Sequence, residues 1–523
     1  MSPVVLPAEL LGGSIFRHLQ YDRSSMHACL LVNRFWCQNM VSWLWTRPFE
    51  LAKPQEPSPE LIDTYISCFN RDECDVLSRE AGIEPPISPS QTTFDYASFL
   101  RELHDTKLSY SILQWLYSIY LKRFPAEPFR GPFLEISRFK SCRKKQIDRV
   151  TLLLGKILLG RCSTLNRLAL DLDIYTSAII NFSGVYTKCF SHLRCFVLKD
   201  SNNTGEICNQ LSHVCNNLHE LELDQAIEGN ALKGVVQLIK AQNRLKKFKL
   251  RVEEQSAIRI IFSTLANRSR YLTSLYCTSV NIDHIDPMDL SKILDNLETL
   301  GLAYCSLRQN IALSARRLKN LYFEDTTRIT VTVEAAKSLI ESTNGNLRRL
   351  SLGGATSILM STIKKYCSNL IDLNVCVWGG KSTNFPDFLG FLVCCPRLEK
   401  LQINDTLRVP PPWNTSPWLI EMSRFLPTTL WSLEIPWEFT PEALQAFLEK
   451  CRAPIKELYL TNHINLVDAH LEYLTQYAIK KETLKKLGVS SYCSLTGEAL
   501  REASEVMMVT RYGVRLLSLV GRR

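Results

Sequence analysis

Residue types that carry catalytic or metal chemistry occur throughout this chain, but their spacing matches no catalytic signature. The 523 residues include eighteen cysteines and nine histidines. There is no H-E-x-x-H, G-x-S-x-G, P-loop or C-x-x-C pattern, and the histidines are scattered. We therefore expect a protein that is not an enzyme, with no cofactor and no bound metal.

The cysteines are better explained as reduced, buried thiols than as a redox centre or a disulfide framework. The adjacent pair Cys394-Cys395 is the arrangement closest to a redox site. Eighteen cysteines are few for a chain of 523 residues, which argues against a disulfide scaffold. Pro7 and Glu9 interrupt any signal peptide, and Lys156 interrupts the best apolar run. We expect a cytoplasmic or nuclear protein without membrane contact.

The elements that would position functional residues follow from a repeated pattern, L-x-x-L-x-L. Its fourteen copies are separated by 21 to 32 residues, close to the 20 to 29 typical of leucine-rich repeats. They begin at Leu165, Leu193, Leu218, Leu245, Leu272, Leu297, Leu318, Leu347, Leu370, Leu398, Leu430, Ile455, Leu484 and Val514. The regular spacing indicates a repeat array, because such a loose pattern would also match an apolar chain by chance.

Helix-like stretches lie between the copies, as a crossover between parallel strands requires. One places Ala335, Ala336, Leu339 and Ile340 on one face, and another places Leu444, Phe447 and Leu448 together. Cysteines recur at repeat positions, namely Cys162, Cys215, Cys305, Cys367 and Cys395. The pattern resembles the cysteine-containing class of leucine-rich repeats. The expected fold is an α/β solenoid: a leucine-rich-repeat horseshoe over residues 151–523, with parallel strands and convex helices, preceded by a small all-α module.

The N-terminal residues 1–48 resemble an F-box, in whose family this repeat class is common. The resemblance rests on a Leu-Pro start, an Ile-Phe pair, an apolar C-L-L-V-N-R-F-W core and a closing Val41, Leu44 and Trp45. It implies docking onto the Skp adaptor of SCF-type ubiquitin ligases through an apolar surface. The adaptor-binding residues would be Leu6, Pro7, Leu10, Ile15, Phe16, Leu30, Val32 and Trp36. Gly12-Gly13 departs from the family pattern and would weaken the first helix. The alternative is a small helical core without a partner.

Residues 49–150 separate the two patterns and are expected to connect them. An apolar and aromatic run from Phe94 to Leu116 predicts helices, and the segment from Phe124 to Phe133 predicts a turn-rich joint. We expect a rigid connector that caps the first repeat, because an uncapped terminal repeat would expose its core. A flexible tether is the alternative.

The concave surface of the repeats is the expected binding surface for a target protein. Tyr276, Tyr322 and Tyr459 occupy outward strand positions, and tyrosine is enriched at binding hot spots. Trp413 and Trp418 lie in a proline-rich gap after Leu398 that would form either a binding loop or a cap. Trp378 follows a strand and precedes two glycines.

The net charge of +10 raises the question of nucleic-acid binding. The most basic strand, Lys247, Lys249 and Arg251, is predicted to lie beside an acidic strand that contains Glu220 and Glu222. The two strands would neutralise each other, so nucleic acid is an unlikely partner.

We therefore expect a substrate-receptor subunit of an SCF-type cullin-RING ubiquitin ligase. Its F-box would bind the Skp adaptor, and through it the cullin and RING scaffold, while the repeats bind a protein substrate. The alternative is a stand-alone leucine-rich-repeat scaffold without a role in ubiquitin transfer.

Overall fold

The computed structural model describes residues 16–19, 22–51, 59–81, 92–123, 132–171, 187–199, 202–225, 227–308, 315–324, 331–354, 356–378, 385–405, 415–461 and 465–512. The chain divides into two compact units, residues 1–250 and residues 251–523. None of the helices in the described part is long and apolar enough to cross a membrane.

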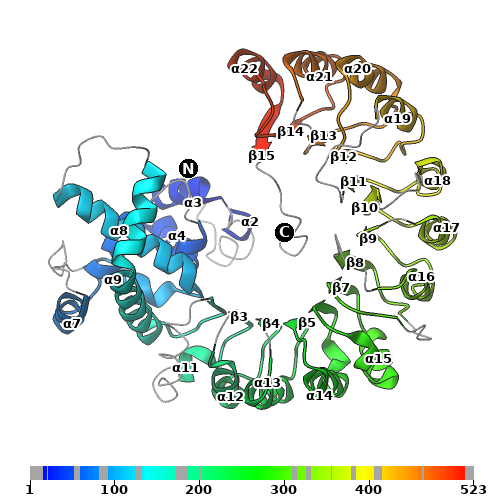
Figure 1. Cartoon of the computed structure of the whole chain (residues 1–523). Coiled ribbons are helices and arrows are strands. Elements are labelled where there is room, and N and C mark those ends of the chain that lie inside the picture. Colours follow the sequence, from blue (N-terminus) through cyan, green and yellow to red (C-terminus); the bar gives the residue numbers. More distant parts are fainter. Residues whose placement is uncertain are drawn as a thin grey trace, which may run out of the picture. The chain divides into compact units, whose positions relative to one another are not determined.

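The first unit begins with helices (Figure 1). They are α2 (Arg17–Leu19), α3 (Arg23–Leu30), α4 (Arg34–Leu44), α5 (Pro48–Leu51), α6 (Pro59–Ser67), α7 (Arg71–Ala81), the 3₁₀ helix η2 (Tyr96–Phe99), α8 (Asp105–Arg123) and α9 (Pro132–Arg161). The indole N–H of Trp115 donates to Asp63 Oδ1 at 2.6 Å, which joins α8 to α6. Trp115 is fully buried, so this hydrogen bond satisfies its polar atom inside the core.

The aromatic run that predicts helices forms them only in part. Residues Tyr96–Phe99 form a 3₁₀ turn, and Glu102–His104 form a strand, β1. The register pairs Leu103 of β1 with Leu168 of β2 (Arg167–Leu170) in parallel. Tertiary pairing thus overrides the local pattern here, and the parallel sheet begins before the first predicted repeat.

The rest of the first unit alternates strands and helices. The elements after β2 are α11 (Thr187–Phe190), β3 (Cys195–Lys199), α12 (Thr204–Val214), β4 (Glu220–Asp224), α13 (Asn230–Ala241) and β5 (Lys247–Arg251). Strands β1 to β5 pair in chain order, and every pair is parallel.

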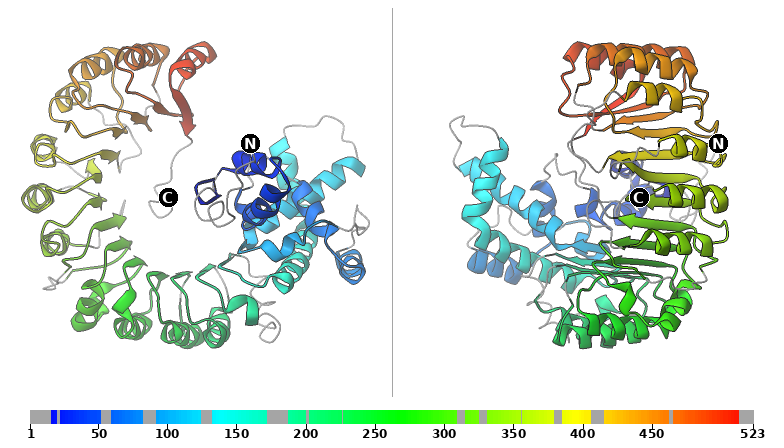
Figure 2. Two further views of the ribbon diagram at one scale, coloured as in Figure 1. Left: turned by 180° about the vertical axis from the view of Figure 1, so that it is seen from behind. Right: turned by 45° about the vertical axis from the view of Figure 1, so that its right-hand side comes forward.

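The second unit continues the alternation. Its strands are β6 (Ser274–Thr278), β7 (Thr299–Ala303), β8 (Asn320–Glu324), β9 (Arg349–Leu352), β10 (Asp372–Trp378), β11 (Lys400–Asp405), β12 (Ser432–Ile435), β13 (Glu457–Leu460), β14 (Lys486–Ser490) and β15 (Met508–Tyr512). Its α-helices are α14 (Gln255–Ala266), α15 (Pro287–Leu294), α16 (Val333–Ser342), α17 (Ser357–Tyr366), α18 (Phe385–Leu392), α19 (Ser416–Met422), α20 (Pro441–Lys450), α21 (Asp468–Lys481) and α22 (Gly497–Val506). Two 3₁₀ turns, η3 (Ser269–Tyr271) and η4 (Ile282–His284), flank β6. Within this unit, Figure 2 shows the helices covering the outer side of the strands.

The repeat prediction is confirmed for thirteen of the fourteen copies. Each of strands β2 to β14 begins two residues after the first leucine or isoleucine of a copy, and these first residues are all buried, at no more than 5% exposed. The copy at Val514 lies outside the described residues, and the last described strand ends before it. Parallel strands followed by outer helices confirm the α/β solenoid of leucine-rich-repeat type.

Four outer helices of the second unit begin with the same capping device. The hydroxyls of Thr332, Thr356, Thr440 and Thr496 accept a hydrogen bond from the backbone N–H three residues later, at 3.2 to 3.3 Å. Threonine at this position satisfies an N–H that would otherwise lack an acceptor. The predicted apolar faces of α16 and α20 are buried, including Leu339 and Phe447.

The repeat cysteines are structural. All eighteen are free thiols. Four of them donate to a backbone carbonyl of the preceding repeat: Cys162 to Leu100, Cys215 to Leu193, Cys305 to Cys277, and Cys395 to Cys367. Burial raises the pKa of Cys305 to about 12, so this thiol stays protonated and serves packing.

Candidate interaction surfaces

The N-terminal helices α2 to α4 form a small module with its own core. Phe16, Met26 and Met40 are each 0% exposed. The Phe16 ring meets the edges of Trp36 and Trp43, with ring centroids 5.7 and 6.5 Å apart. The module is therefore a folded helical unit rather than a loose extension.

The turn between α3 and α4 exposes apolar side chains. Asn33 caps α4 by accepting from the Trp36 N–H at 2.9 Å, so the chain must turn just before it. Leu31 and Val32 occupy this turn with 76% and 57% of their surface exposed. Adjacent exposed side chains of this type mark a candidate binding surface.

The predicted adaptor-binding residues fall into three groups. Leu6, Pro7, Leu10 and Ile15 lie outside the described residues. Phe16 is fully buried, so any role in binding would be through the core it fills. Leu30 and Trp36 are half-buried against that core, whereas Val32 is exposed. Leu31, which is not among the predicted adaptor-binding residues, is more exposed than any of the described ones.

The module is hydrogen-bonded to the start of the sheet. The carbonyl of Thr46 accepts from the N–H groups of Arg101 and Glu102, at 2.9 and 3.1 Å. Trp45 also meets Tyr65 of α6 edge-on, with centroids 5.2 Å apart. These hydrogen bonds connect the end of the module to Glu102, the first residue of β1, and so attach the module to the repeats of the first unit.

On the inner face of the first unit, acidic and basic strand residues pair as predicted. The register sets Glu220 opposite Lys247 and Glu222 opposite Lys249. Lys249 Nζ lies 2.7 Å from Glu222 Oε1. The predicted pairing of the acidic strand with the basic strand is thus seen in the register and in the Glu222–Lys249 ion pair.

On the inner face of the second unit, two predicted tyrosines meet at a glycine. The register places Gly301 of β7 between Tyr276 of β6 and Tyr322 of β8. Both tyrosines are half-buried, and burial raises the pKa of Tyr322, while Arg349 close to its hydroxyl acts in the opposite direction. The side-chain-free position between two aromatic rings is the best-formed candidate anchor site on this face.

The other predicted aromatic anchors do not join this site. Tyr459 lies on β13, where its hydroxyl donates to Glu457 Oε2 at 2.7 Å and Lys486 Nζ lies 5.5 Å from its ring centroid. Trp378 ends β10 rather than following it, and its side chain lies outside what the structure describes. Trp413 also lies outside the described residues.

The loop interpretation of Trp418 is wrong. Trp418 lies in α19 and is half-buried, and Pro417 occupies the first turn of that helix instead of stiffening a loop. Proline suits this position, where its missing N–H would have no partner within the helix. The helix belongs to the outer layer, so Trp418 is not part of the inner strand face.

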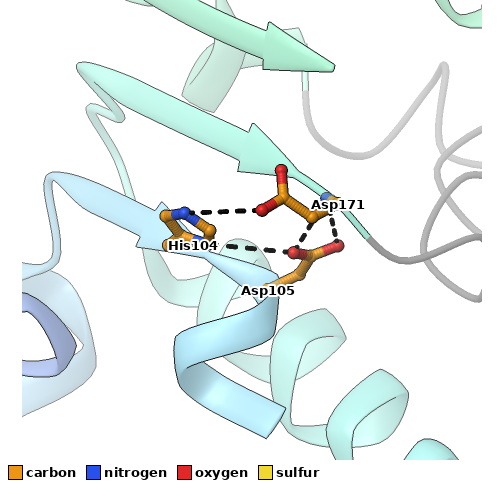
Figure 3. A group of neighbouring side chains, drawn as sticks. All are labelled: His104, Asp105 and Asp171. Carbon is orange, nitrogen blue, oxygen red and sulfur yellow. Dashed lines mark hydrogen bonds and ion pairs between the residues drawn. The ribbon is translucent and has the colours of Figure 1, made fainter. Parts of the chain in front are cut away.

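One cluster of metal-ligating residue types forms where β1 and β2 end, a place that sequence spacing does not reveal (Figure 3). His104 Nε2 lies 3.8 Å from Asp171 Oδ2, and His104 Nδ1 lies 3.9 Å from Asp105 Oδ1. The backbone N–H of Asp171 donates to both oxygens of the fully buried Asp105, at 3.0 Å each.

This donor set is compatible with a divalent cation, but the chain already supplies positive charge to it. Lys199 Nζ lies 3.9 Å from Asp171 Oδ2. Asp105 is also the first residue of α8. A carboxylate at the start of a helix satisfies backbone N–H groups and interacts favourably with the helix dipole. We assign the cluster a structural role in holding β2 to the start of α8.

Comparison with solved structures finds proteins of low similarity to this chain. A crystal structure of a Bacteroides fragilis protein is similar at 13% identity and a TM-score of 0.27, covering 56% of this chain and 74% of that one. A leucine-rich-repeat protein of Leptospira interrogans is similar at 13% identity and a TM-score of 0.27, covering 69% and 87%. No family model and no curated protein matches the chain. The repeat architecture is itself that of a protein-interaction scaffold, since stacked repeats create an extended binding surface.

Proposed function

We propose that this chain is the substrate-receptor subunit of an SCF-type cullin-RING ubiquitin ligase. The N-terminal module would bind the Skp adaptor, and the repeats would bind the protein to be ubiquitinated. The observation that carries the proposal is the exposed turn Leu31-Val32, at 76% and 57% exposure, within a segment whose sequence resembles an F-box. An apolar turn of this kind is suited to a hydrophobic adaptor contact.

The attachment of the module to the sheet supports this role. A receptor must hold its target at a defined place relative to the ligase, and the Thr46 carbonyl is hydrogen-bonded to Arg101 and Glu102 at the start of β1. Binding of an adaptor to the module would therefore fix the repeats of the first unit relative to that adaptor. The chain supplies no catalytic group in this scheme, and ubiquitin transfer is the work of its partners.

Adaptor binding tests the proposal with the full chain and a purified Skp adaptor. Leu31→Asp with Val32→Asp should reduce binding at least about tenfold, because both changes place charge in an apolar contact. Ile358→Asp with Val393→Asp is the matched control, since these side chains are exposed at 48% and 60% in the second unit. Leu6→Ala with Pro7→Ala should also abolish binding. A folded wild-type chain that does not bind the adaptor would leave the stand-alone scaffold as the better assignment.

Target capture is assigned to the site formed by Tyr276, Gly301 and Tyr322. Two half-buried tyrosine rings on neighbouring positions of one strand face, one of them packed over a glycine, offer an aromatic surface for an apolar group of a partner. Proximity labelling in cells with wild type, with Tyr276→Ala plus Tyr322→Ala, and with Tyr271→Ala tests this site. Tyr271 is 46% exposed on η3 and serves as the control. Proteins lost only from the double variant are target candidates, and identical labelling by all three chains would contradict the assignment.

A further inference from the structure

A strongly basic surface runs along the middle of α9, outside the sites described above. Three exposed basic residues lie on one side of this helix at about 100° per residue: Arg138, Lys145 and Arg149, here called the basic face. Lys140, Arg143 and Lys144 are also exposed but lie on the other side of the helix. The stretch from residue 138 to residue 149 contains six basic residues and one acidic residue, Asp148, a net charge of +5. Half of the net charge of +10 thus lies in one short stretch of helix.

The charge of the basic face is not compensated within the described part of the molecule. No ion pair joins any of its three side chains to another described residue, whereas Lys249 on the inner face pairs with Glu222 at 2.7 Å. Lys145 and Arg149 are four residues apart on the helix, so their like charges repel each other. Asp148 is half-buried and is the only acidic residue in the stretch.

The helix is held by its opposite side, so the basic face is presented to solvent. Phe139 packs on Tyr117 and Tyr120 of α8, with ring centroids 5.3 and 5.4 Å apart. Ile147 and Val150 are buried on this same side, at 3% and 0% exposed. Packing therefore fixes the rotation of α9 and leaves the charged side without an internal role.

An apolar edge borders the basic face at the end of α8. Tyr120 and Leu121 are 39% and 37% exposed, and Lys122 and Arg123 follow them with exposed side chains. Because Tyr120 packs on Phe139, this edge lies beside the start of the basic face. Basic and apolar groups together are typical of protein interfaces, in which arginine and aromatic residues are enriched.

We propose that the basic face of α9, with the Tyr120-Leu121 edge, is a docking surface for an acidic segment of a partner protein. The three side chains of the basic face span eleven helical steps, or about 17 Å, enough for a short acidic peptide with one or two apolar side chains. A single-stranded nucleic acid would require a series of exposed aromatic rings for base stacking, and the exposed side of α9 between residues 138 and 149 carries none. The docking surface is independent of the adaptor and target sites assigned above.

Fluorescence anisotropy with the full-length chain tests the proposal at about 0.15 M salt. The probe is a fluorescein-labelled peptide of repeating Glu-Glu-Leu-Glu units, compared with a short labelled DNA duplex. The wild-type chain should bind the peptide more tightly than the duplex. Arg138→Glu with Lys145→Glu and Arg149→Glu should weaken peptide binding at least about tenfold, and added salt should weaken the wild-type complex.

The matched control changes net charge equally on other helices. Lys233→Glu, Arg259→Glu and Arg501→Glu alter exposed positions on α13, α14 and α22 and should leave peptide binding within about twofold of wild type. Thermal unfolding confirms that both triple variants remain folded. Three results would overturn the proposal: no peptide binding by wild type, equal loss in the control variant, or tighter binding of the duplex than of the peptide.

Discussion

The aromatic ring of Tyr276 lies directly against Gly301 on the neighbouring strand. A Cβ atom added at Gly301 would meet Tyr276 Cδ1 at 2.4 Å, far inside van der Waals contact. The same glycine faces Tyr322 from the other side, in the register of β7 and β8. The absence of a side chain at this one position thus determines how the Tyr276 ring is presented on the inner face.

Gly301→Ala should displace the Tyr276 ring and lower the free energy of unfolding by about 1 to 2 kcal/mol, because the new methyl group overpacks the strand pair. Urea unfolding measures the loss. Gly390→Ala is the matched control, since nothing lies within 4 Å of its added Cβ and it occupies α18. The control should be neutral or stabilising by up to about 1 kcal/mol. Equal effects at both positions would contradict the packing of Tyr276 on Gly301.

Gly234→Ala should destabilise the first unit more than Gly301→Ala destabilises the second. A Cβ at Gly234 would lie 1.8 Å from the backbone oxygen of Gly205, where α13 crosses α12. Backbone cannot rotate away as a side chain can, so the helices must separate, at a cost of about 2 to 3 kcal/mol or more. Differential scanning calorimetry of the two variants compares the losses. A Gly234→Ala chain as stable as wild type would contradict this crossing.

The Glu222–Lys249 pair should contribute modestly to stability. Its atoms lie 2.7 Å apart, and the side chains are 24% and 15% exposed. A double-mutant cycle with Glu222→Ala and Lys249→Ala should give a coupling energy of about 0.5 to 1 kcal/mol that shrinks in high salt. The exchanged pair Glu222→Lys with Lys249→Glu should recover most of the coupling. A coupling energy near zero would mean that other charged residues nearby, and not this pair, neutralise Glu222 and Lys249.

Removing the Asp105 carboxylate should weaken the joint between β2 and α8. Asp105→Ala leaves the backbone N–H of Asp171 without its two acceptor oxygens, which we expect to cost about 1 to 3 kcal/mol. Asp105→Asn keeps one acceptor oxygen and should cost less than the alanine variant. Urea unfolding ranks the three chains. If asparagine costs as much as alanine, the charge of Asp105 matters more than its hydrogen bonds.

The buried thiols predict a loss of stability in alkali. Burial raises the pKa of Cys208 to about 12 and that of Cys215 to about 11. Unfolded thiols ionise near pH 8.5, so above that pH the unfolded chain releases protons that the folded chain retains. The free energy of unfolding should therefore fall as the pH rises from about 8.5 towards 11 or 12, by up to about 1.4 kcal/mol per pH unit for each such thiol.

Urea unfolding at a series of pH values checks this dependence. Cys208→Ala should flatten the pH dependence, because it removes one of the buried thiols. Cys142→Ala is the control, since Cys142 is exposed on α9 and its replacement should leave the slope unchanged. A stability that is constant between about pH 8 and pH 10 would contradict the burial of these thiols as a source of the effect.

For some residues the local sequence pattern is enough to predict their place in the structure, and for others only tertiary pairing decides it. Leu165, Leu218 and Leu398 could be placed in the core from spacing alone, because a leucine-rich repeat buries the same positions every time. The strand Glu102–His104 could not, because its three residues lie in a run that fits a helix and they become a strand only by pairing with β2. Trp418 shows the same limit, since its proline neighbours are compatible with either a loop or a helix start.

The sequence by itself determined the repeat architecture, the burial of the repeat cysteines and the pairing of the acidic strand with the basic one, because each depends on a period that recurs along the chain. Only the tertiary structure decided which residues at distant positions meet. It placed Tyr276 and Tyr322 on either side of Gly301, brought Asp171 to Asp105, and turned the charged side of α9 outward by packing Phe139 on α8. These relationships depend on strand register and helix rotation, which are set by contacts between segments and not by local residue preference.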